Sequence, residues 1–248
     1  MLIVGNWKAY VDDAKQAKEL VVLARRVAAS GKHRVIVAPP APYLGLLSKK
    51  GKSKLSFAAQ DVSSAAGGAR TGETTAAMLA DFGVSYVIVG HSERRREGET
   101  DTLVATKAGQ AFAAGLIPIL CIGEKARDID AQYLKELRAQ LNAVITAVPQ
   151  KHRAKIIVAY EPVWAIGKSA LDAIQPGDLA EMVLYIRKAL SEHVPAKEAA
   201  KMKVIYGGSV EPANIASLAK EGLVDGFLVG HASAEVKSFA ALIKAFAA

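Results

Sequence analysis

The strongest constraint on the fold is a repeated alternation between short apolar segments and longer segments with helical periodicity. The short segments are residues 2–6, 34–38, 55–60, 86–90, 116–122, 155–160, 203–206 and 226–229. The main helical segments are 12–30, 42–50, 74–82, 101–114, 130–148, 178–193, 212–221 and 234–246. Nearly every short segment is apolar at successive positions, which is typical of parallel strands covered on both faces. The pattern therefore predicts an α/β protein built on a parallel sheet.

Two folds fit this pattern, an open doubly wound sheet and a closed eightfold β/α barrel. Units of about 30 residues match the βα repeat of both. Eight strand segments, the lack of any stretch that resembles a second domain, and the lack of a glycine-rich dinucleotide motif after the first strand favour the barrel. A chain of 248 residues, 51% of them hydrophobic, can bury the core of one large domain. We predict a single (β/α)8 (TIM) barrel domain over residues 1–248.

Composition limits the compartment and the partners. No apolar run approaches the ~20 residues that span a bilayer, and no basic segment precedes the short apolar run at the N-terminus. The one cysteine, Cys121, lies in an apolar strand segment and is interpreted as a small core residue. One cysteine can form neither an internal disulfide nor a cysteine-built metal site. We expect a cytoplasmic protein with no membrane contact.

The net charge of +8 and the pI of about 9.5 raise the question of nucleic-acid binding. Most cations are spread through helical segments that also carry Glu and Asp. The one basic run, Arg94 to Arg96, is flanked by Glu93 and Glu97 and is interpreted as a salt-bridging segment. Basic residues do not alternate with aromatic ones as they do in single-strand binders. We therefore expect no nucleic-acid partner. The mild positive field would attract an anionic small molecule, and solubility explains the charge equally well.

Polar residues follow the predicted strands at their C-terminal ends, where a β/α barrel carries its active site. They are Asn6, Lys8, Gln60, His91, Glu93, Glu161, Ser209, Gly230 and His231. Pro162 pushes Glu161 toward extended geometry, which places this carboxylate at the end of a strand. A carboxylate, an imidazole, an ammonium and an amide at one mouth suit proton transfer next to a carbonyl group.

The residue types indicate separate tasks in such a reaction. Glu161 suits a general base. His91 directly precedes a Ser-Glu-Arg stretch, where the N-terminus of a helix would disfavour the imidazolium and keep a neutral hydrogen-bond donor. Lys8 adds a positive charge where an oxyanion develops. The glycine-rich stretches 206–209 and 230–233 suit phosphate, because backbone N–H groups and a helix N-terminus attract anions.

Six motifs then identify a family. They are Gly5-Asn6-Trp7-Lys8, Thr71-Gly72-Glu73, Gly90-His91-Ser92-Glu93-Arg94-Arg95, Cys121-Ile122-Gly123-Glu124, Tyr160-Glu161-Pro162-Val163-Trp164-Ala165-Ile166-Gly167 and Tyr206-Gly207-Gly208-Ser209-Val210. In this order and spacing they make the chain resemble the triosephosphate isomerase family along essentially its whole length. The resemblance implies reversible isomerisation of dihydroxyacetone phosphate and D-glyceraldehyde 3-phosphate through an enediolate. It also implies that no metal and no organic cofactor takes part.

The resemblance assigns roles to individual residues. It implies that Glu161 is the base, that His91 is the electrophile and that Lys8 stabilises the enediolate, with Asn6 and Glu93 supporting them. It further implies that the phosphate is held by four residues: Gly167, Ser209, Gly230 and the N–H of His231. Residues 65–75 resemble the interdigitating loop of the family, with Thr71 reaching toward a partner's site. A homodimer is therefore expected.

The chain departs from the family pattern at two places. The lid reads Ala165-Ile166-Gly167-Lys168-Ser169-Ala170, whereas the family usually has Ala-Ile-Gly-Thr-Gly-Lys. His231 stands where the family usually has glycine, and it either tolerates the phosphate contact or is strained by a positive φ. Two other functions are open: an isomerase of a four-carbon sugar phosphate on the same site, suggested by the lid, and a non-catalytic binding barrel.

Overall fold

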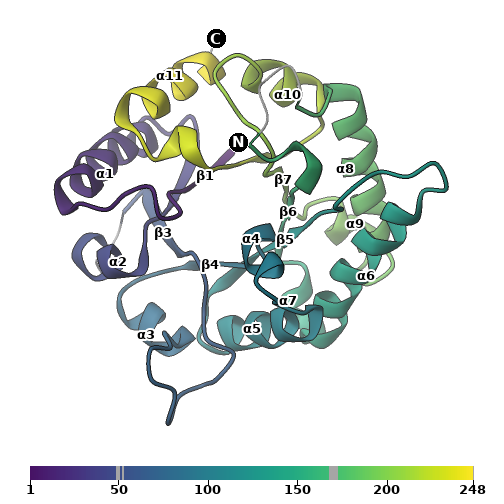
Figure 1. Ribbon diagram of the computed structural model, residues 1–248, viewed down its shortest axis with the longest axis horizontal. Helices are drawn as coiled ribbons and strands as arrows, with labels where there is room; N and C mark the ends of the chain where they lie inside the picture. Colours follow the sequence, from purple (N-terminus) through teal and green to yellow (C-terminus); the bar gives the residue numbers. More distant parts are fainter. Residues whose placement is uncertain (49–50, 52, 168–172, 248) are drawn as a thin grey trace.

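The strands form a closed barrel. The computed structural model describes residues 1–48, 51, 53–167 and 173–247. In this part of the chain, eight parallel strands pair in chain order, and β1 (Leu2–Asn6) pairs with β8 (Gly226–Val229) to close the ring (Figure 1). This confirms the predicted (β/α)8 barrel and excludes the open sheet.

The elements agree with the predicted segments to within a few residues. The other strands are β2 (Arg34–Ala38), β3 (Leu55–Ala59), β4 (Tyr86–Val89), β5 (Ile117–Ile122), β6 (Ile157–Tyr160) and β7 (Val204–Tyr206). The predicted helical segments correspond to α1 (Ala14–Ala29), α2 (Ala41–Leu47), α3 (Ala76–Asp81), α5 (Asp101–Ala113), α6 (Gln132–Ala147), α8 (Pro176–Leu190), α10 (Ile215–Glu221) and α11 (Val236–Ala247). Residues 49 and 50, at the end of the predicted segment 42–50, lie outside the described residues.

Several short helices lie outside the predicted helical segments, although a helix start after His91 was expected. They are α4 (Ser92–Arg96), α7 (Gln150–Arg153), α9 (Ala196–Ala199) and the 3₁₀ turns η1 (Val163–Ala165) and η2 (His231–Ser233). Segments of three to five residues are too short to display a helical period. Three of them, α4, η1 and η2, follow strands at the functional end of the barrel, so they bear on the site.

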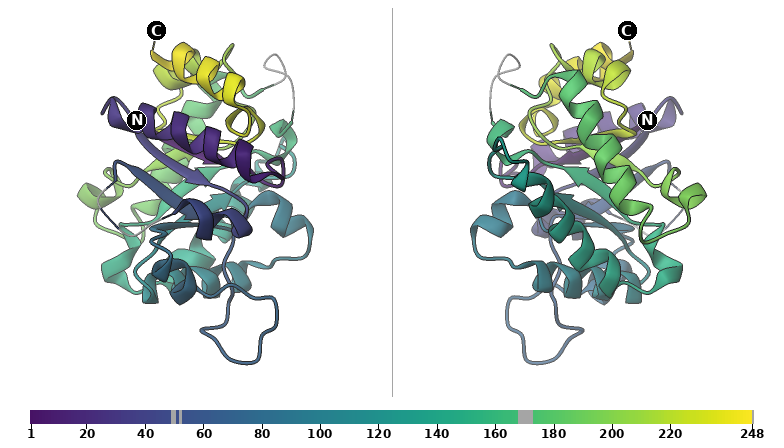
Figure 2. Two further views of the ribbon diagram at one scale, coloured as in Figure 1. Left: turned by 90° about the vertical axis from the view of Figure 1, so that its left-hand side faces the viewer. Right: turned by 90° about the vertical axis from the view of Figure 1, so that its right-hand side faces the viewer.

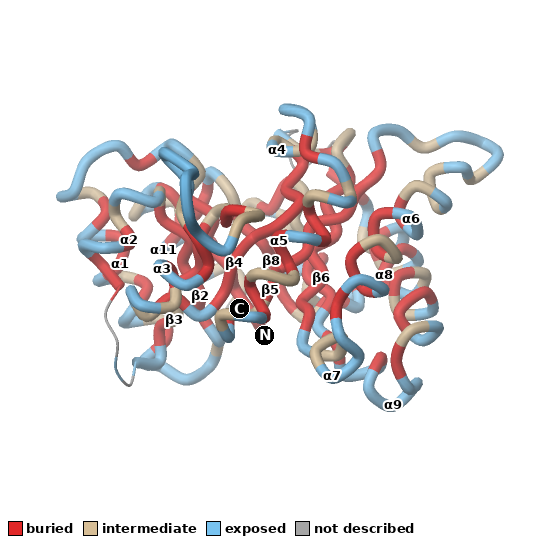
Figure 3. Tube along the Cα trace, turned by 90° about the horizontal axis from the view of Figure 1, so that it is seen from below, coloured by how far each residue is buried: buried red, intermediate tan, exposed pale blue. Residues whose placement is uncertain are grey.

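Both faces of the sheet are covered, which explains the continuous apolar strands. Alternate strand residues such as Val4, Ile36 and Cys121 fill the barrel interior, and their neighbours such as Ile3 and Val35 pack under the helices. Figure 3 shows this buried centre between exposed helix surfaces. Cys121 is completely buried and free, as predicted for a core residue.

Closing the barrel requires a close backbone approach between the first and last strands. Gly226 pairs with Leu2, and a Cβ atom at position 226 would lie 2.0 Å from the carbonyl oxygen of Leu2. Only glycine fits there without moving one of the strands.

In Figure 3, α4 lies at the upper end of the barrel and α7 and α9 at the lower end, so the strands point their C-terminal ends upward. Within the described chain, no helix is long and apolar enough to cross a membrane.

We expect His33, at the lower end of the barrel, to reduce stability in acid. Its ring packs on Phe246 at 4.6 Å between centroids. Burial, then the N-terminal ammonium and Lys32, lower the pKa of His33 from 6.5. The unfolded chain therefore binds this proton more readily, and the stabilising contribution, present at higher pH, is lost as pH falls below about 6.5. Urea unfolding at pH 7.5 and 5.5 should show the loss.

The control is His33→Phe, which keeps a ring against Phe246 and removes the titrating group. Its stability should change less between the two pH values than that of the wild type. If the free energy of unfolding of the two proteins changes equally between pH 7.5 and 5.5, His33 is not the group that causes the loss in acid.

Candidate active site

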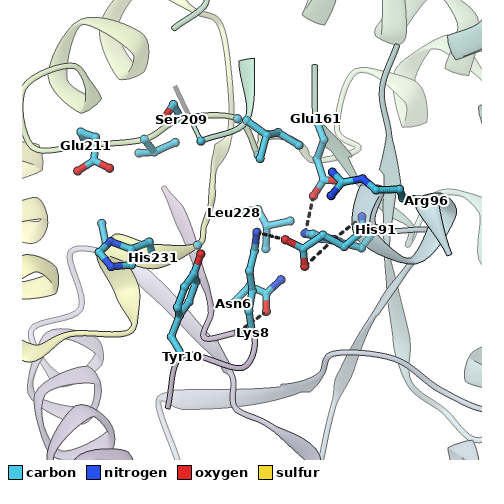
Figure 4. Close-up of a pocket in the computed structure, with 18 residues that line it drawn as sticks. Asn6, Lys8, Tyr10, His91, Arg96, Glu161, Ser209, Glu211, Leu228 and His231 are labelled. Atoms are coloured by element: carbon cyan, nitrogen blue, oxygen red, sulfur yellow. Dashed lines mark hydrogen bonds and ion pairs between the residues drawn. The ribbon is translucent and has the colours of Figure 1, made fainter. Parts of the chain in front are cut away.

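One pocket at the C-terminal ends of the strands contains all nine predicted site residues (Figure 4). They are Asn6, Lys8, His91, Glu93, Glu161, Gly167, Ser209, Gly230 and His231. The sequence did not indicate Tyr10, Arg96 and Glu211, which also line the pocket. These three lie beyond the first residues after each strand, and only the folded loops bring them in.

Lys8 is held in an unusual backbone conformation next to β1. Its φ is 46°, in the left-handed region that a residue with a side chain seldom occupies. The backbone N–H of Lys8 donates to Asn6 Oδ1 at 3.1 Å, and Gln60 Nε2 donates to the carbonyl oxygens of Lys8 and Ala38, both at 2.9 Å. Asn6 and Gln60 thus act on the lysine backbone. Gln60, which the sequence placed among the strand-end residues, is a support and lies outside the pocket lining.

The ammonium group of Lys8 forms an ion pair inside the pocket. Lys8 Nζ lies 2.6 Å from Glu93 Oε1. Partial burial by itself raises the pKa of Glu93, but the hydrogen bond and charge of Lys8, with a smaller effect from the charge of Arg96, bring it below 4.5. The pair fixes the lysine head group at the mouth of the barrel.

His91 is the N-cap of α4, as the sequence predicted from its position before Ser-Glu-Arg. Its Nδ1 accepts the backbone N–H of Glu93 at 3.2 Å, so Nδ1 carries no proton in this geometry. A neutral ring then has its single N–H at Nε2. Nε2 points toward Glu161 and lies 3.4 Å from Oε1. The cap therefore fixes which ring nitrogen faces the pocket.

Glu161 follows β6 directly and is 1% exposed. Its backbone N–H donates to Ile122 at 2.8 Å, and its Oε2 accepts the backbone N–H of Ser92 at 3.1 Å. The opposite wall is a glycine: a Cβ atom at Gly207 would lie 2.8 Å from Glu161 Cγ. Because Gly207 has no side chain, it leaves room for the side chain of Glu161.

The segment after Glu161 is tied to a second buried carboxylate, Glu124. Glu124 Oε1 accepts Tyr160 Oη–H and Trp164 Nε1–H, both at 2.8 Å, and lies 3.3 Å from Arg127 Nε. Burial, followed by the nearby charge of Glu124, raises the pKa of Tyr160. Arg127 also lies over the Trp164 ring at 5.1 Å. These contacts anchor η1 and hence the backbone leading from Glu161 to Gly167. The altered lid residues 168–170 lie outside the described residues.

The predicted phosphate residues gather at one side of the pocket. Ser209 and the glycines before it follow β7, while Gly230 follows β8 and His231 is the first residue of η2. Gly167 ends the described part of the lid with a φ of 70°, a conformation that favours glycine. The first N–H groups of a helical turn have no acceptor inside it, so the start of η2 suits an anion.

His231 is accommodated without backbone strain. It does not belong to the residues with positive φ, so the strained alternative is excluded. Its exposed imidazole packs edge-to-face on Tyr10, with centroids 5.1 Å apart and an interplanar angle of 83°. The ring therefore rests on the pocket rim while its backbone stays at the start of η2.

We expect His231→Gly to change KM by less than about tenfold, which corresponds to about 1.4 kcal/mol. The packing on Tyr10 accounts for the ring, and the backbone N–H is retained. Steady-state kinetics of the wild type, His231→Gly and His231→Gln would measure the effect. A rise in KM well beyond tenfold in both variants would show that the imidazole itself binds substrate.

The arrangement can remove a proton from carbon and stabilise the resulting oxyanion. Glu161 supplies a carboxylate, His91 an N–H donor and Lys8 a positive charge, all facing one pocket. Among the described residues, no group of three or more His, Cys, Asp or Glu side chains is placed to hold a metal ion.

Comparisons with known proteins agree with this geometry. The family model for triosephosphate isomerase matches residues 1–246. The triosephosphate isomerase of Bradyrhizobium sp. (strain ORS 278) is 42% identical over 98% of this chain and 96% of its own length. That of Thermus thermophilus is 41% identical over 98% of both chains, and that of Xanthomonas campestris pv. campestris (strain 8004) is 40% identical over 100% of this chain and 98% of its own. The chain therefore belongs to the triosephosphate isomerase family.

Proposed function

We propose that the protein interconverts dihydroxyacetone phosphate and D-glyceraldehyde 3-phosphate. Family membership over the whole chain supports this activity. The observation that carries the proposed mechanism is the approach of His91 Nε2 to Glu161 Oε1, 3.4 Å apart, in the pocket that also contains Lys8. A substrate whose carbonyl carbon and neighbouring carbon lie against both groups would meet a base and a hydrogen-bond donor together.

In this mechanism Glu161 takes a proton from the carbon next to the carbonyl group. The electron pair moves onto the carbonyl oxygen, which gives an enediolate stabilised by the Nε2–H of His91 and the ammonium of Lys8. His91 moves a proton between the two oxygens. Glu161 then returns its proton to the adjacent carbon, so the reaction has no net oxidation.

In this mechanism the predicted phosphate residues anchor the substrate. Gly167, Ser209, Gly230 and the N–H of His231 would hold the phosphate, and Asn6 and Glu93 would keep Lys8 in place. Ser209 lines the pocket and is 8% exposed, so little of it is open to bulk solvent. Binding the non-reacting phosphate positions the reacting carbons at Glu161.

A steady-state assay in both directions with the two triose phosphates tests the proposal. Activity on both is expected, with a much lower kcat/KM for a four-carbon aldose phosphate. Higher kcat/KM on the four-carbon substrate would replace the proposal with the related isomerase. Binding without turnover of any of them would indicate a non-catalytic barrel.

We also propose a homodimer formed through residues 65–75. This loop projects from the barrel in Figure 2, and residues 66–73 are exposed. Large apolar side chains are exposed on neighbouring elements: Leu46 is 45%, Met78 52% and Phe82 50% exposed. Light scattering should give twice the chain mass of 26.1 kDa. Phe82→Asp should shift the measured mass toward that of the monomer, and a monomeric wild type would reject the dimer.

We also propose that the protein is cytoplasmic, a compartment in which its free Cys121 would stay reduced.

A further inference from the structure

Three consecutive arginines follow His91, and two of them are committed to the fold. Arg94 lies 3.3 Å from Asp61 Oδ2 and 3.0 Å from Glu97 Oε2. Arg95 donates to the carbonyl oxygen of Gly90 at 2.8 Å and pairs with Asp101 at 2.5 Å. These contacts confirm the salt-bridging interpretation for Arg94 and Arg95.

Arg96 is different. It is the last residue of α4, it is exposed, and its side chain lines the active-site pocket. In the part of the chain that the structure describes, it makes no hydrogen bond and no ion pair. Figure 4 shows its guanidinium group on the side of the pocket that holds Glu161 and His91. Its charge reaches into the site: burial raises the pKa of Glu93, and Arg96 helps to lower it, with a smaller effect than that of Lys8.

The charges that line the pocket give this cation its importance. Among the described lining residues, the charged side chains are Lys8, Glu93, Arg96, Glu161 and Glu211. Lys8 is paired with Glu93, so the opposite charge of Glu93 largely cancels the attraction of Lys8 for an anion that is still outside the pocket. In the lining that the structure describes, this leaves two carboxylates, Glu161 and Glu211, and one cation outside an ion pair, Arg96. Without Arg96, the described lining would carry three carboxylate side chains and one ammonium group, an unfavourable balance for an anionic substrate.

We infer that Arg96 is a substrate-recruiting residue, which attracts the phosphate dianion to the pocket mouth and lowers KM. This inference rests on the proposed function. A cation in a cleft with low-dielectric walls raises the local concentration of an anion, and the effect decreases with salt. A guanidinium group also suits transient bidentate contact with phosphate. The role differs from that of Lys8, whose fixed ammonium serves the reacting oxygens.

The test compares Arg96→Gln, Arg96→Lys and Arg26→Gln. Arg26 lies in the last turn of α1, so its variant loses the same unit of charge away from the pocket. At low ionic strength, Arg96→Gln should raise the KM for the triose phosphate about tenfold with kcat within about twofold. Arg96→Lys should recover most of the loss, and Arg26→Gln should match the wild type. At about 0.5 M salt the difference between Arg96→Gln and wild type should shrink to less than about threefold.

A binding measurement separates this inference from the proposed function. Inorganic phosphate titrated into each protein by calorimetry should bind about tenfold more weakly to Arg96→Gln at low salt, whether or not the protein turns over triose phosphates. Unchanged phosphate affinity and KM in Arg96→Gln would overturn the recruiting role while leaving the isomerase intact. A lower kcat with a shifted pH profile and unchanged KM would overturn it as well, because Arg96 would then act through Glu93.

Discussion

Replacing Glu161 with Asp is expected to lower kcat by about 100-fold with the fold intact. The shorter side chain withdraws the carboxylate by about one methylene, and misplacement of a reacting group by about 1 Å can cost this much. The structure leaves little room for compensation, because the backbone of Glu161 is tied to Ile122 and its Oε2 to the N–H of Ser92. Steady-state kinetics and thermal unfolding would be measured together.

Glu211→Asp is the matched control for this change. Glu211 lines the same pocket but has no contact with His91 among the described residues, so its shortening should alter kcat by less than about threefold. A Glu161→Asp enzyme with an undiminished kcat would end the claim that this carboxylate is the base. A variant that fails to fold would direct the test to Glu161→Gln, which preserves side-chain length.

Lys8→Met is expected to lower kcat by about 100- to 1,000-fold, the usual cost of removing one group that stabilises a developing oxyanion. Methionine approximates the length of the lysine chain and faces the same strained φ of 46°, so backbone strain is nearly unchanged. The variant also removes the partner that holds the pKa of Glu93 down. The kcat of the variant and its pH profile are the measurements.

The double variant Lys8→Met/Glu93→Gln separates two causes. If the loss comes from the missing positive charge, the double variant stays as slow as Lys8→Met. If it comes from an uncompensated carboxylate beside the substrate, Glu93→Gln restores much of the rate and contradicts the role given to Lys8. Lys15→Met, at an exposed position in the first turn of α1, should behave as wild type.

The residues immediately after strands could be predicted because their signal is local. Asn6, His91 and Glu161 each end or follow an apolar run, and parallel strands in a barrel open at one mouth. The cap position of His91 was likewise visible in the residues that follow it. The conformation of His231 was open from the sequence, and the structure decided it by placing the ring on Tyr10 with ordinary backbone angles.

Arg96 shows why other site residues could not be predicted. Successive residues of a helix point about 100° apart, so three adjacent arginines face three directions. Arg94 forms an ion pair with Asp61 and Arg95 forms one with Asp101, while Arg96 lines the pocket. Nothing in the local sequence distinguishes them, because their partners come from other parts of the chain.

The sequence by itself determined the alternation of strands and helices, the order of the polar residues at strand ends and the family to which the chain belongs. These follow from apolar periodicity, cap residues and motifs, which are properties of neighbouring residues. The sequence favoured a closed ring, and the tertiary structure shows the contact that closes it, between Gly226 and Leu2. Only the tertiary structure decided that Lys8 is paired with Glu93 and that Arg96 faces the pocket without a described partner. The closing contact and the charge pairing depend on distances between segments far apart in the chain, and local patterns do not contain those distances.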